Sequence, residues 1–461
     1  MARPTTVHVC SECGHETPRW AGQCPGCGEW NTLIEQPVRA AGGGPGGRGP
    51  GARVRGRGVA ATPITLGDIA ADEQQRLRTG IGELDNVLGG GIVPGSLILI
   101  GGAPGIGKST LTTMALANLL AAGRRTLYVS AEESAAQIRL RAERLSAATA
   151  LQIPVIAETD LHTVLATLEH ERPDVCVIDS VQALHSSDLS SAAGSVAQVR
   201  EVASEIMRIA KAQRTAVLLV GHVTKDGALA GPRVLEHMVD CVLSFEGERE
   251  RTYRTLRALK NRFGPAHEAG VFEMRDDGLV EVLDASARFV GEATRAAGSV
   301  VLCAMEGSRP LLVEVQALVC RSELVPPRRV VSGLDRNRVA LVLAVLGRHG
   351  GIGLGAADVF VNVVGGVRVD DPGADLAVAL AVASAVRRVE LTAAGGRRPL
   401  ACFGELGLTG ELRTVAHGDR RLAEAQKFGL TPVIAPEAHT TLRAALAAAI
   451  GDARESAAIA A

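Results

Sequence analysis

Short, mostly apolar segments alternate with longer helix-forming segments through the middle of the chain. The strand-like segments are 97–100, 126–130, 175–180 and 216–221, and the helical segments are 111–122, 134–145 and 196–213. Buried strands joined by helices are typical of a parallel sheet, which binds ligands beyond the carboxyl ends of its strands. The pattern therefore predicts an α/β domain that begins near Thr65 and covers about 63–285.

The pattern changes from about Ser286. Alternating strand-like runs cover 299–319, further strands are predicted at 359–364 and 431–435, and helices are predicted at 336–347, 375–385 and 413–428. Strands and helices that follow one another in this irregular order favour an α+β architecture. We therefore predict a separate α+β domain over 286–461.

A phosphate-binding loop follows the first apolar strand. Residues 102–109 match the pattern G-x-x-x-x-G-K-S/T, with a strand before them and a helix after them. Glycines let the backbone N–H groups surround a phosphate, and the following helix directs its positive dipole end at the same anion. We expect ATP to be bound by Gly102, Ala103, Pro104, Gly105, Ile106, Gly107, Lys108, Ser109 and Thr110.

Two of these residues have specific expected roles, and two acidic positions complete the site. Lys108 would reach the outer phosphates, and Ser109 would ligate the Mg²⁺ that accompanies them. Asp179 ends a buried strand, where it could hold the same Mg²⁺ through water, although an apolar strand ending in Asp is common by itself. Glu132 is the preferred general base for the attacking water, because Glu133 is better explained as an acid that stabilises a helix N-terminus.

Two C-x-x-C pairs lie near the N-terminus. Cys10, Cys13, Cys24 and Cys27 offer four thiolates, which form a closed tetrahedral Zn²⁺ site. The surrounding residues are too few to fold unaided, so the metal would stabilise the module at 1–35. A redox pair, or two turns without metal, is the less favoured alternative because a redox motif is expected once, beside a βαβ unit.

A Gly/Arg-rich stretch, 36–62, separates this module from the α/β domain. It contains Arg48, Arg53, Arg55 and Arg57 among many glycines, and such a composition favours a disordered linker. The arginines would be either a weak tether for nucleic acid or part of a solvated spacer, and we favour the spacer.

Composition narrows the functional classes. The chain has 461 residues, a formal net charge of −1 and 2% aromatic residues, so any nucleic-acid surface must be local and extensive base stacking is not expected. No apolar run reaches the roughly 18 residues of a membrane-spanning helix, and no signal peptide is evident. Cysteine usage suits a reducing compartment, and we expect a cytoplasmic protein without a membrane partner.

Five motifs together resemble a known family. The phosphate-binding loop and the stretches 130–134 (SAEES) and 178–180 (IDS) are similar to a RecA-fold core. The four-cysteine module and Lys260-Asn261-Arg262-Phe263-Gly264 narrow the resemblance to the bacterial RadA (Sms) family of DNA repair proteins. The resemblance covers nearly the whole chain. It implies a hexameric ATP-driven motor, related to DnaB-type helicases, that binds single-stranded DNA and extends recombination intermediates made by RecA.

The same resemblance implies further site residues. Lys260 and Arg262 would project toward the nucleotide of a neighbouring subunit in the ring, where a guanidinium suits the charge that grows on the phosphate. Without the resemblance, these residues would be interpreted as a basic turn after a strand. Lys225 and Arg233 are candidates for contacts with DNA backbone phosphates.

The C-terminal domain resembles the proteolytic domain of Lon proteases. Such a protease needs a serine nucleophile and a lysine base. Gly373 stands at the expected serine position, and the segment 412–415 has no lysine, Lys427 being the nearest. We therefore expect no peptidase activity. Two other functions remain as alternatives, namely an ATP-dependent Lon-like protease and a signalling ATPase of the RecA superfamily that does not use DNA.

Overall fold

The structure, a computed structural model, describes most of the chain. The described residues are 6–10, 15–26, 28–30, 32–37, 65, 75–145, 149–189, 191–223, 229–230, 234–247, 253–266, 268–291, 293–393, 396 and 398–451. Apart from its first two residues, the predicted linker lies outside this part. The chain forms two compact units, the first being Met1–Ile81, Leu88–Leu243 and Lys260–Gly264, and the second Gly82–Val87, Ser244–Leu259 and Pro265–Ala461.

The N-terminal residues form a small antiparallel sheet. Its strands are β1 (Thr6–Cys10), β2 (Glu16–Thr17) and β3 (Leu33–Pro37), in the order β2-β1-β3. Among the residues described there, Cys10, Cys24 and Leu33 form one buried cluster. A cluster of this size agrees with a module that depends on a metal for stability.

A parallel sheet is the framework of the first unit. The strands β4 (Leu97–Gly102), β8 (Ala216–Val220), β7 (Val175–Asp179), β5 (Thr126–Ser130) and β6 (Val155–Ala157) lie in that order, and all of these pairings are parallel. All but β6 are completely buried, which explains their apolar sequences. The four strands and the sheet type predicted from the sequence are thereby confirmed.

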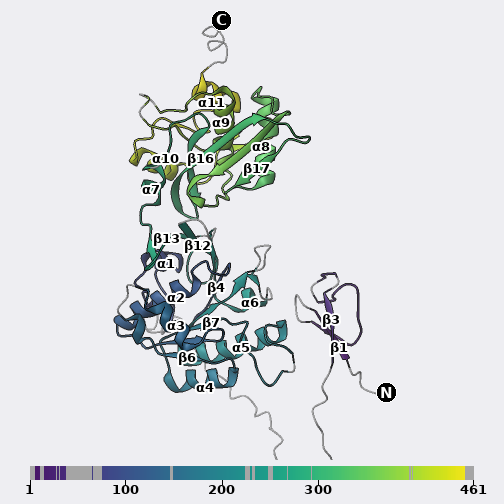
Figure 1. The fold of residues 1–461 in the computed structure, drawn as a ribbon, viewed down its shortest axis with the longest axis vertical. Coiled ribbons are helices and arrows are strands. Elements are labelled where there is room, and N and C mark those ends of the chain that lie inside the picture. Colours follow the sequence, from purple (N-terminus) through teal and green to yellow (C-terminus); the bar gives the residue numbers. More distant parts are fainter. Residues whose placement is uncertain are drawn as a thin grey trace, which may run out of the picture. The chain divides into compact units, whose positions relative to one another are not determined.

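Helices cover this sheet (Figure 1). They are α2 (Lys108–Ala121), α3 (Ala135–Ala142), α4 (Leu161–Glu171), α5 (Val196–Gln213) and α6 (Val234–Met238), with a short 3-10 helix at Ala150–Gln152. The predicted cap Ser134 accepts a hydrogen bond from the Gln137 amide. The unit also contains β9 (His222–Val223), β10 (Leu229–Ala230) and the beginning of β11 (Cys241–Glu246).

The second unit contains an antiparallel meander and a mixed sheet. The meander consists of β12 (Tyr253–Asn261), β13 (Ala269–Arg275) and β14 (Gly278–Glu281). The last two residues of β12 belong to the first unit. The helix α1 (Gly82–Val87) packs on β13. The mixed sheet has the order β17 (Arg329–Ser332), β18 (Ala357–Val363), β16 (Arg309–Arg321), β15 (Ser299–Glu306), β19 (Ala401–Cys402) and β22 (Val433–Ile434).

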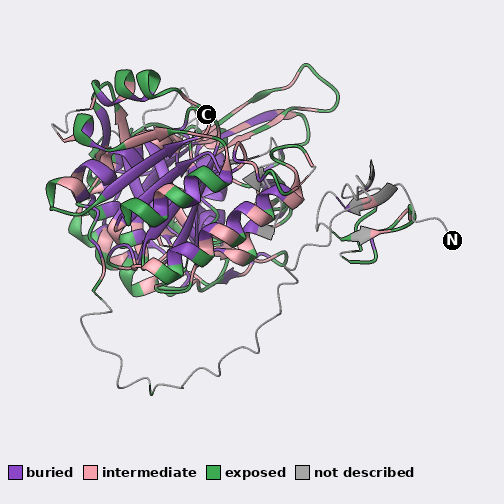
Figure 2. Ribbon diagram, turned by 90° about the horizontal axis from the view of Figure 1, so that it is seen from below, coloured by how far each residue is buried: buried purple, intermediate pink, exposed green. Residues whose placement is uncertain are grey.

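In the described part of this unit, five helices accompany these strands. They are α7 (Ala285–Gly291), α8 (Arg336–His349), α9 (Ala374–Arg387), α10 (Gly418–Lys427) and α11 (Leu442–Ile450), and a 3-10 turn covers Val364–Gly366. The eleven residues 374–384 of α9 are all buried. In Figure 2 buried residues dominate the inner strands, whereas the outer helices combine buried, intermediate and exposed residues. The α+β architecture is as predicted.

Two predicted helices were too long. The helix predicted at 134–145 ends at Ala142. The segment 413–428 becomes helical only at Gly418, because Arg413 ends the hairpin of β20 (Glu405–Leu406) and β21 (Leu412–Arg413). Within the part of the chain that the structure describes, we find no helix with the length and apolarity required to cross a bilayer.

Candidate active site

The phosphate-binding loop connects β4 to α2, as the sequence predicts. Gly105 and Gly107 have φ angles of 77° and 115°, a left-handed region that residues with side chains disfavour. Ile106 between them is buried and anchors the loop. A cleft of about 250 Å³ opens beside it, lined by Gly107, Lys108, Ser109, Thr110, Glu132, Glu133, Arg141 and Asp179.

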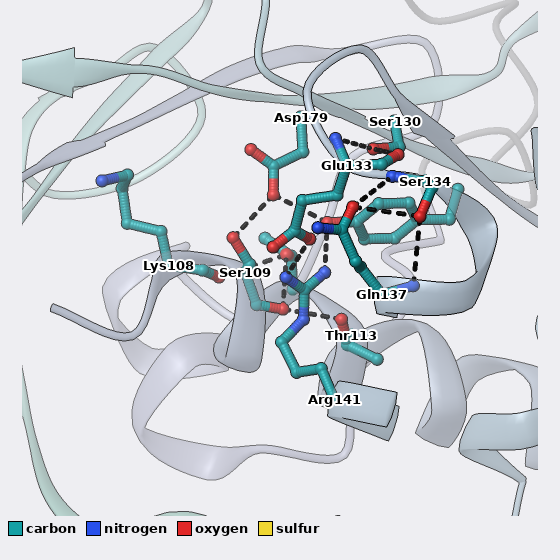
Figure 3. Close-up of polar contacts among 11 residues, drawn as sticks. Lys108, Ser109, Thr113, Ser130, Glu133, Ser134, Gln137, Arg141 and Asp179 are labelled. Atoms are coloured by element: carbon teal, nitrogen blue, oxygen red, sulfur yellow. Dashed lines mark hydrogen bonds and ion pairs between the residues drawn. The ribbon is translucent and has the colours of Figure 1, made fainter. Parts of the chain in front are cut away.

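Lys108 is held against the loop. Its ammonium group donates hydrogen bonds to the carbonyl oxygens of Gly102, at 2.7 Å, and Ala103, at 3.1 Å. Burial lowers the pKa of Lys108, and the negative charges of Asp179 and Glu132 oppose this effect. In Figure 3 its side chain extends away from Asp179 and Glu133. The lysine is thus a positive charge fixed at the start of α2, where the helix dipole also attracts anions.

Ser109 and Asp179 meet in the cleft. The Ser109 hydroxyl donates to Asp179 Oδ2 at 2.6 Å, although the two residues come from α2 and from the end of β7. The Tyr128 hydroxyl contacts the same carboxylate oxygen at 2.7 Å. A hydroxyl and a carboxylate are hard oxygen donors of the kind that Mg²⁺ prefers, and they are close enough to share one ion with water. The residues therefore fit a magnesium ion.

The two glutamates after β5 have different environments. Glu132 is exposed at the cleft, and its Oε1 atom accepts a hydrogen bond from the Ser180 hydroxyl. Glu133 forms an ion pair with Arg141, and its backbone N–H donates to Ser130 Oγ at 3.0 Å. The carboxylate of Glu133 is therefore engaged by a guanidinium, whereas that of Glu132 is held by the Ser180 hydroxyl.

Lys260 and Arg262 are not among the residues that line the cleft. The Lys260 ammonium donates to the carbonyl oxygens of Glu236, at 2.7 Å, and Val239, at 2.9 Å, near the end of α6, and burial lowers the pKa of Lys260. Arg262 forms an ion pair with Asp240 at 3.0 Å. Each basic side chain therefore has a partner in its own subunit.

Four other predicted residues lie outside the described part: Cys13, Cys27, Lys225 and Arg233. Of the remaining predicted zinc ligands, Cys10 and Cys24 are both buried. The Gly26 N–H donates to Cys24 Sγ at 3.3 Å, and hydrogen bonds of this kind orient a metal-binding sulfur. Two buried thiols, one with such a donor, fit a thiolate site for zinc.

Sequence reasoning missed three residues that the structure brings to the site. They are Tyr128, Ser180 and Arg141. Tyr128 was part of an apolar strand and looked like a core residue, and Arg141 lies eight positions after Glu133 on α3, so no local pattern connects them. Only Ser180 had a usable signal, since it directly follows Asp179 at the end of a strand.

The loop, the carboxylates and the sheet together define a P-loop ATPase with a RecA-like parallel core. In agreement, residues 65–228 match a family described as an AAA domain, and residues 8–35 match a rubredoxin metal binding domain. The chain is 52% identical to the DNA repair protein RadA of Pseudomonas aeruginosa, over 95% of this chain and 94% of that protein. It is 47% identical to the protein of the same name from Escherichia coli, over 96% and 94%, and 45% identical to that of Bacillus subtilis, over 95% and 94%.

The chain belongs to the RadA family of DNA repair proteins. It has an ATP-binding ATPase domain and an N-terminal zinc ribbon. The predicted family and the predicted fold class are both confirmed.

Proposed function

We propose that the chain is an ATP-driven motor that moves along single-stranded DNA and extends branched recombination intermediates as a homo-hexamer, with RecA as a partner. One observation supports this proposal above the others. The cleft of a chain from a DNA repair family brings together Lys108, Ser109, Asp179 and Glu132, which are the groups that a P-loop motor needs for hydrolysis.

Each residue has a distinct role in the proposed reaction. The loop amides and Lys108 bind the outer phosphates of ATP. Ser109 and Asp179 hold Mg²⁺, which neutralises charge on the phosphates when bound. Glu132 orients and deprotonates the attacking water, and its hydrogen bond with Ser180 fixes its direction. The carboxylate of Glu133 is instead engaged by its ion pair with Arg141.

We assign Lys260 and Arg262 to the nucleotide of a neighbouring subunit. Both residues lie outside the cleft of their own chain, and the Arg262 side chain is 51% exposed. A guanidinium supplied in trans stabilises the charge of the transferring phosphoryl group. Lys225 and Arg233 are assigned to DNA phosphates on the sequence alone.

We also propose that the C-terminal domain has no peptidase activity. Gly373 carries no nucleophile, and Lys427 forms an ion pair with Asp284 at 2.8 Å. The domain would instead support the ring and add DNA-binding surface. This argues against the alternative of a Lon-like protease, whereas a signalling ATPase that ignores DNA requires an experiment.

The first experiment is ATP turnover with and without single-stranded DNA, at two salt concentrations. A motor that contacts DNA phosphates should hydrolyse ATP faster with DNA, and the stimulation should decrease at higher salt because the binding releases counterions. A parallel preparation of Lys108→Ala measures contaminating ATPase. ATP turnover that is the same with and without DNA would reject the DNA-motor proposal in favour of the signalling ATPase. Cleavage of casein by the same preparation would support the alternative of a Lon-like protease.

A further inference from the structure

A buried tyrosine lies directly behind the magnesium-binding carboxylate. Tyr128 is 1% exposed on β5, and β7, which ends in Asp179, is its parallel neighbour in the sheet. The Tyr128 hydroxyl is 2.7 Å from Asp179 Oδ2, the atom that Ser109 also contacts. The proposed function assigns no role to this phenol.

The chemistry of the partners fixes the direction of these hydrogen bonds. Arg141 Nη2 lies 3.0 Å from the Tyr128 oxygen, and a guanidinium has only donors, so the phenol oxygen must accept this bond. The single phenol proton is then left for Asp179, which as a carboxylate only accepts. The chain of donors therefore runs from Arg141 through Tyr128 to Asp179.

Arg141 is itself fixed from two sides. Its Nη1 atom pairs with Glu133 at the mouth of the cleft, and its guanidinium carbon lies 5.9 Å from the centre of the Tyr128 ring. Figure 3 shows the guanidinium close to the carboxylate of Glu133, with Asp179 beyond it. Hydrogen bonds that follow one another in this way strengthen each other. The series from Arg141 through Tyr128 therefore holds the Asp179 carboxylate in place.

We propose that Tyr128 and Arg141 are positioning residues for Asp179, and that they set the affinity of the nucleotide site for Mg²⁺. This inference rests on the proposed magnesium role of Ser109 and Asp179, but it does not depend on DNA or on a hexamer. Groups that orient a metal ligand typically change metal affinity 10- to 100-fold. Arg141 acts on Asp179 through the hydroxyl group of Tyr128.

The test is Tyr128→Phe, which removes that hydroxyl alone. Binding of a fluorescent ATP analogue is titrated with Mg²⁺, and binding of the analogue alone is measured in EDTA. We expect the Mg²⁺ concentration at half-saturation to rise about tenfold, with the affinity in EDTA unchanged. Tyr253→Phe is the matched control: Tyr253, the other tyrosine of the chain, also has a buried ring and accepts a hydrogen bond from an arginine, Arg288, at 2.7 Å.

A double-mutant cycle tests the role of Arg141. Arg141→Gln should also raise the Mg²⁺ requirement, and Arg141→Gln in the Tyr128→Phe background should raise it no further, because both substitutions interrupt one path. The proposal would be overturned if the effects of the two substitutions on the Mg²⁺ requirement were additive, or if Tyr128→Phe left that requirement unchanged. It would also be overturned if Tyr128→Phe weakened binding of the ATP analogue equally with Mg²⁺ and in EDTA. Wild-type binding that ignores Mg²⁺ would overturn the magnesium assignment as well.

Discussion

Arg421 and Asp371 form a buried ion pair next to Gly373. The Nη1 and Nη2 atoms of Arg421 lie 2.5 and 3.1 Å from the two carboxylate oxygens of Asp371, and the side chains are only 2% and 6% exposed. A Cβ atom on Gly373 would approach Arg421 Nη1 to 2.9 Å. The space in which the Lon resemblance places a nucleophile is therefore occupied by this ion pair, which has a structural role.

We predict that Arg421→Met destabilises the protein by about 3–5 kcal/mol, because it leaves the buried Asp371 without its counter-ion. The midpoint of urea-induced unfolding measures the loss. The double variant Arg421→Met/Asp371→Leu should recover much of the stability, since neither charge then remains buried. A midpoint equal to that of the wild type in Arg421→Met would show that the pair is not needed.

Lys108→Ala should reduce ATP hydrolysis to background, because the neutral side chain cannot stabilise charge on the outer phosphates. Steady-state phosphate release at saturating ATP is the measurement. Lys211→Ala is a suitable control because Lys211 is exposed on α5. Near-normal turnover in Lys108→Ala would reject the assignment of the nucleotide site.

The proposed action in trans predicts complementation between two inactive variants. In mixtures of Lys108→Ala and Arg262→Ala subunits, some interfaces combine an intact cleft with an intact Arg262, so activity should reappear. Arg262 also neutralises the buried Asp240, whose Oδ2 accepts a hydrogen bond from the Leu97 N–H at 3.1 Å. Asp240→Asn with Arg262→Ala therefore provides a second mixing partner without a buried unpaired charge. If subunits exchange and neither mixture recovers activity, the assignment in trans is wrong.

Replacing one predicted zinc ligand should lower the metal content. We expect Cys24→Ser to contain less zinc per chain by atomic absorption, because three thiolates bind the ion less tightly than four. Cys320→Ser is the control, since Cys320 is exposed on β16. Equal zinc in all three proteins would contradict the four-thiolate site.

Glu306 should make stability depend on pH. Burial raises the pKa of Glu306 from its usual 4.5 to about 7, although Arg257 lies 2.5 Å away and opposes the shift. The folded state thus retains a proton that the unfolded state releases, so stability falls as pH rises from about 4.5 to 7, by at most about 3 kcal/mol.

The corresponding variant is Glu306→Gln, which cannot ionise. Urea midpoints measured at pH 5, 6, 7 and 8 should decrease less steeply for Glu306→Gln than for the wild type. Parallel pH profiles for the two proteins would show that Glu306 does not titrate in this range.

The sequence predicted those parts of the site that follow one another along the chain. The loop 102–109 and the strand ending in Asp179 carry local patterns, because glycine geometry and continuous apolar burial constrain neighbouring residues. The partners of these groups were not predictable in the same way. Tyr128, Arg141 and Asp179 are brought together by strand order and helix packing, and apolar periodicity contains no information about which buried side chain will face a carboxylate.

The C-terminal half shows the same division. The strands β15 and β18 and the helices α8 and α9 were predicted from their apolar patterns. The start of α10 was misplaced because Arg413 pairs with Glu405 in a hairpin, a contact that depends on residues eight positions apart and not on helix propensity.

The position of α1 in the chain affects how the protein is made. Glu83 on α1 is almost completely buried, and its carboxylate receives hydrogen bonds from Arg309, at 2.8 and 2.9 Å, and from the Val271 N–H, at 3.1 Å. At about 5–20 residues per second, the ribosome needs on the order of 10–45 s to proceed from Glu83 to Arg309. During that interval the N-terminal unit can assemble around β4, whereas α1 receives first the strand β13 on which it packs and only later Arg309. The helix α1 is therefore synthesised long before the rest of the unit to which it belongs. A nascent chain that is released early would expose Glu83, which only later residues can bury.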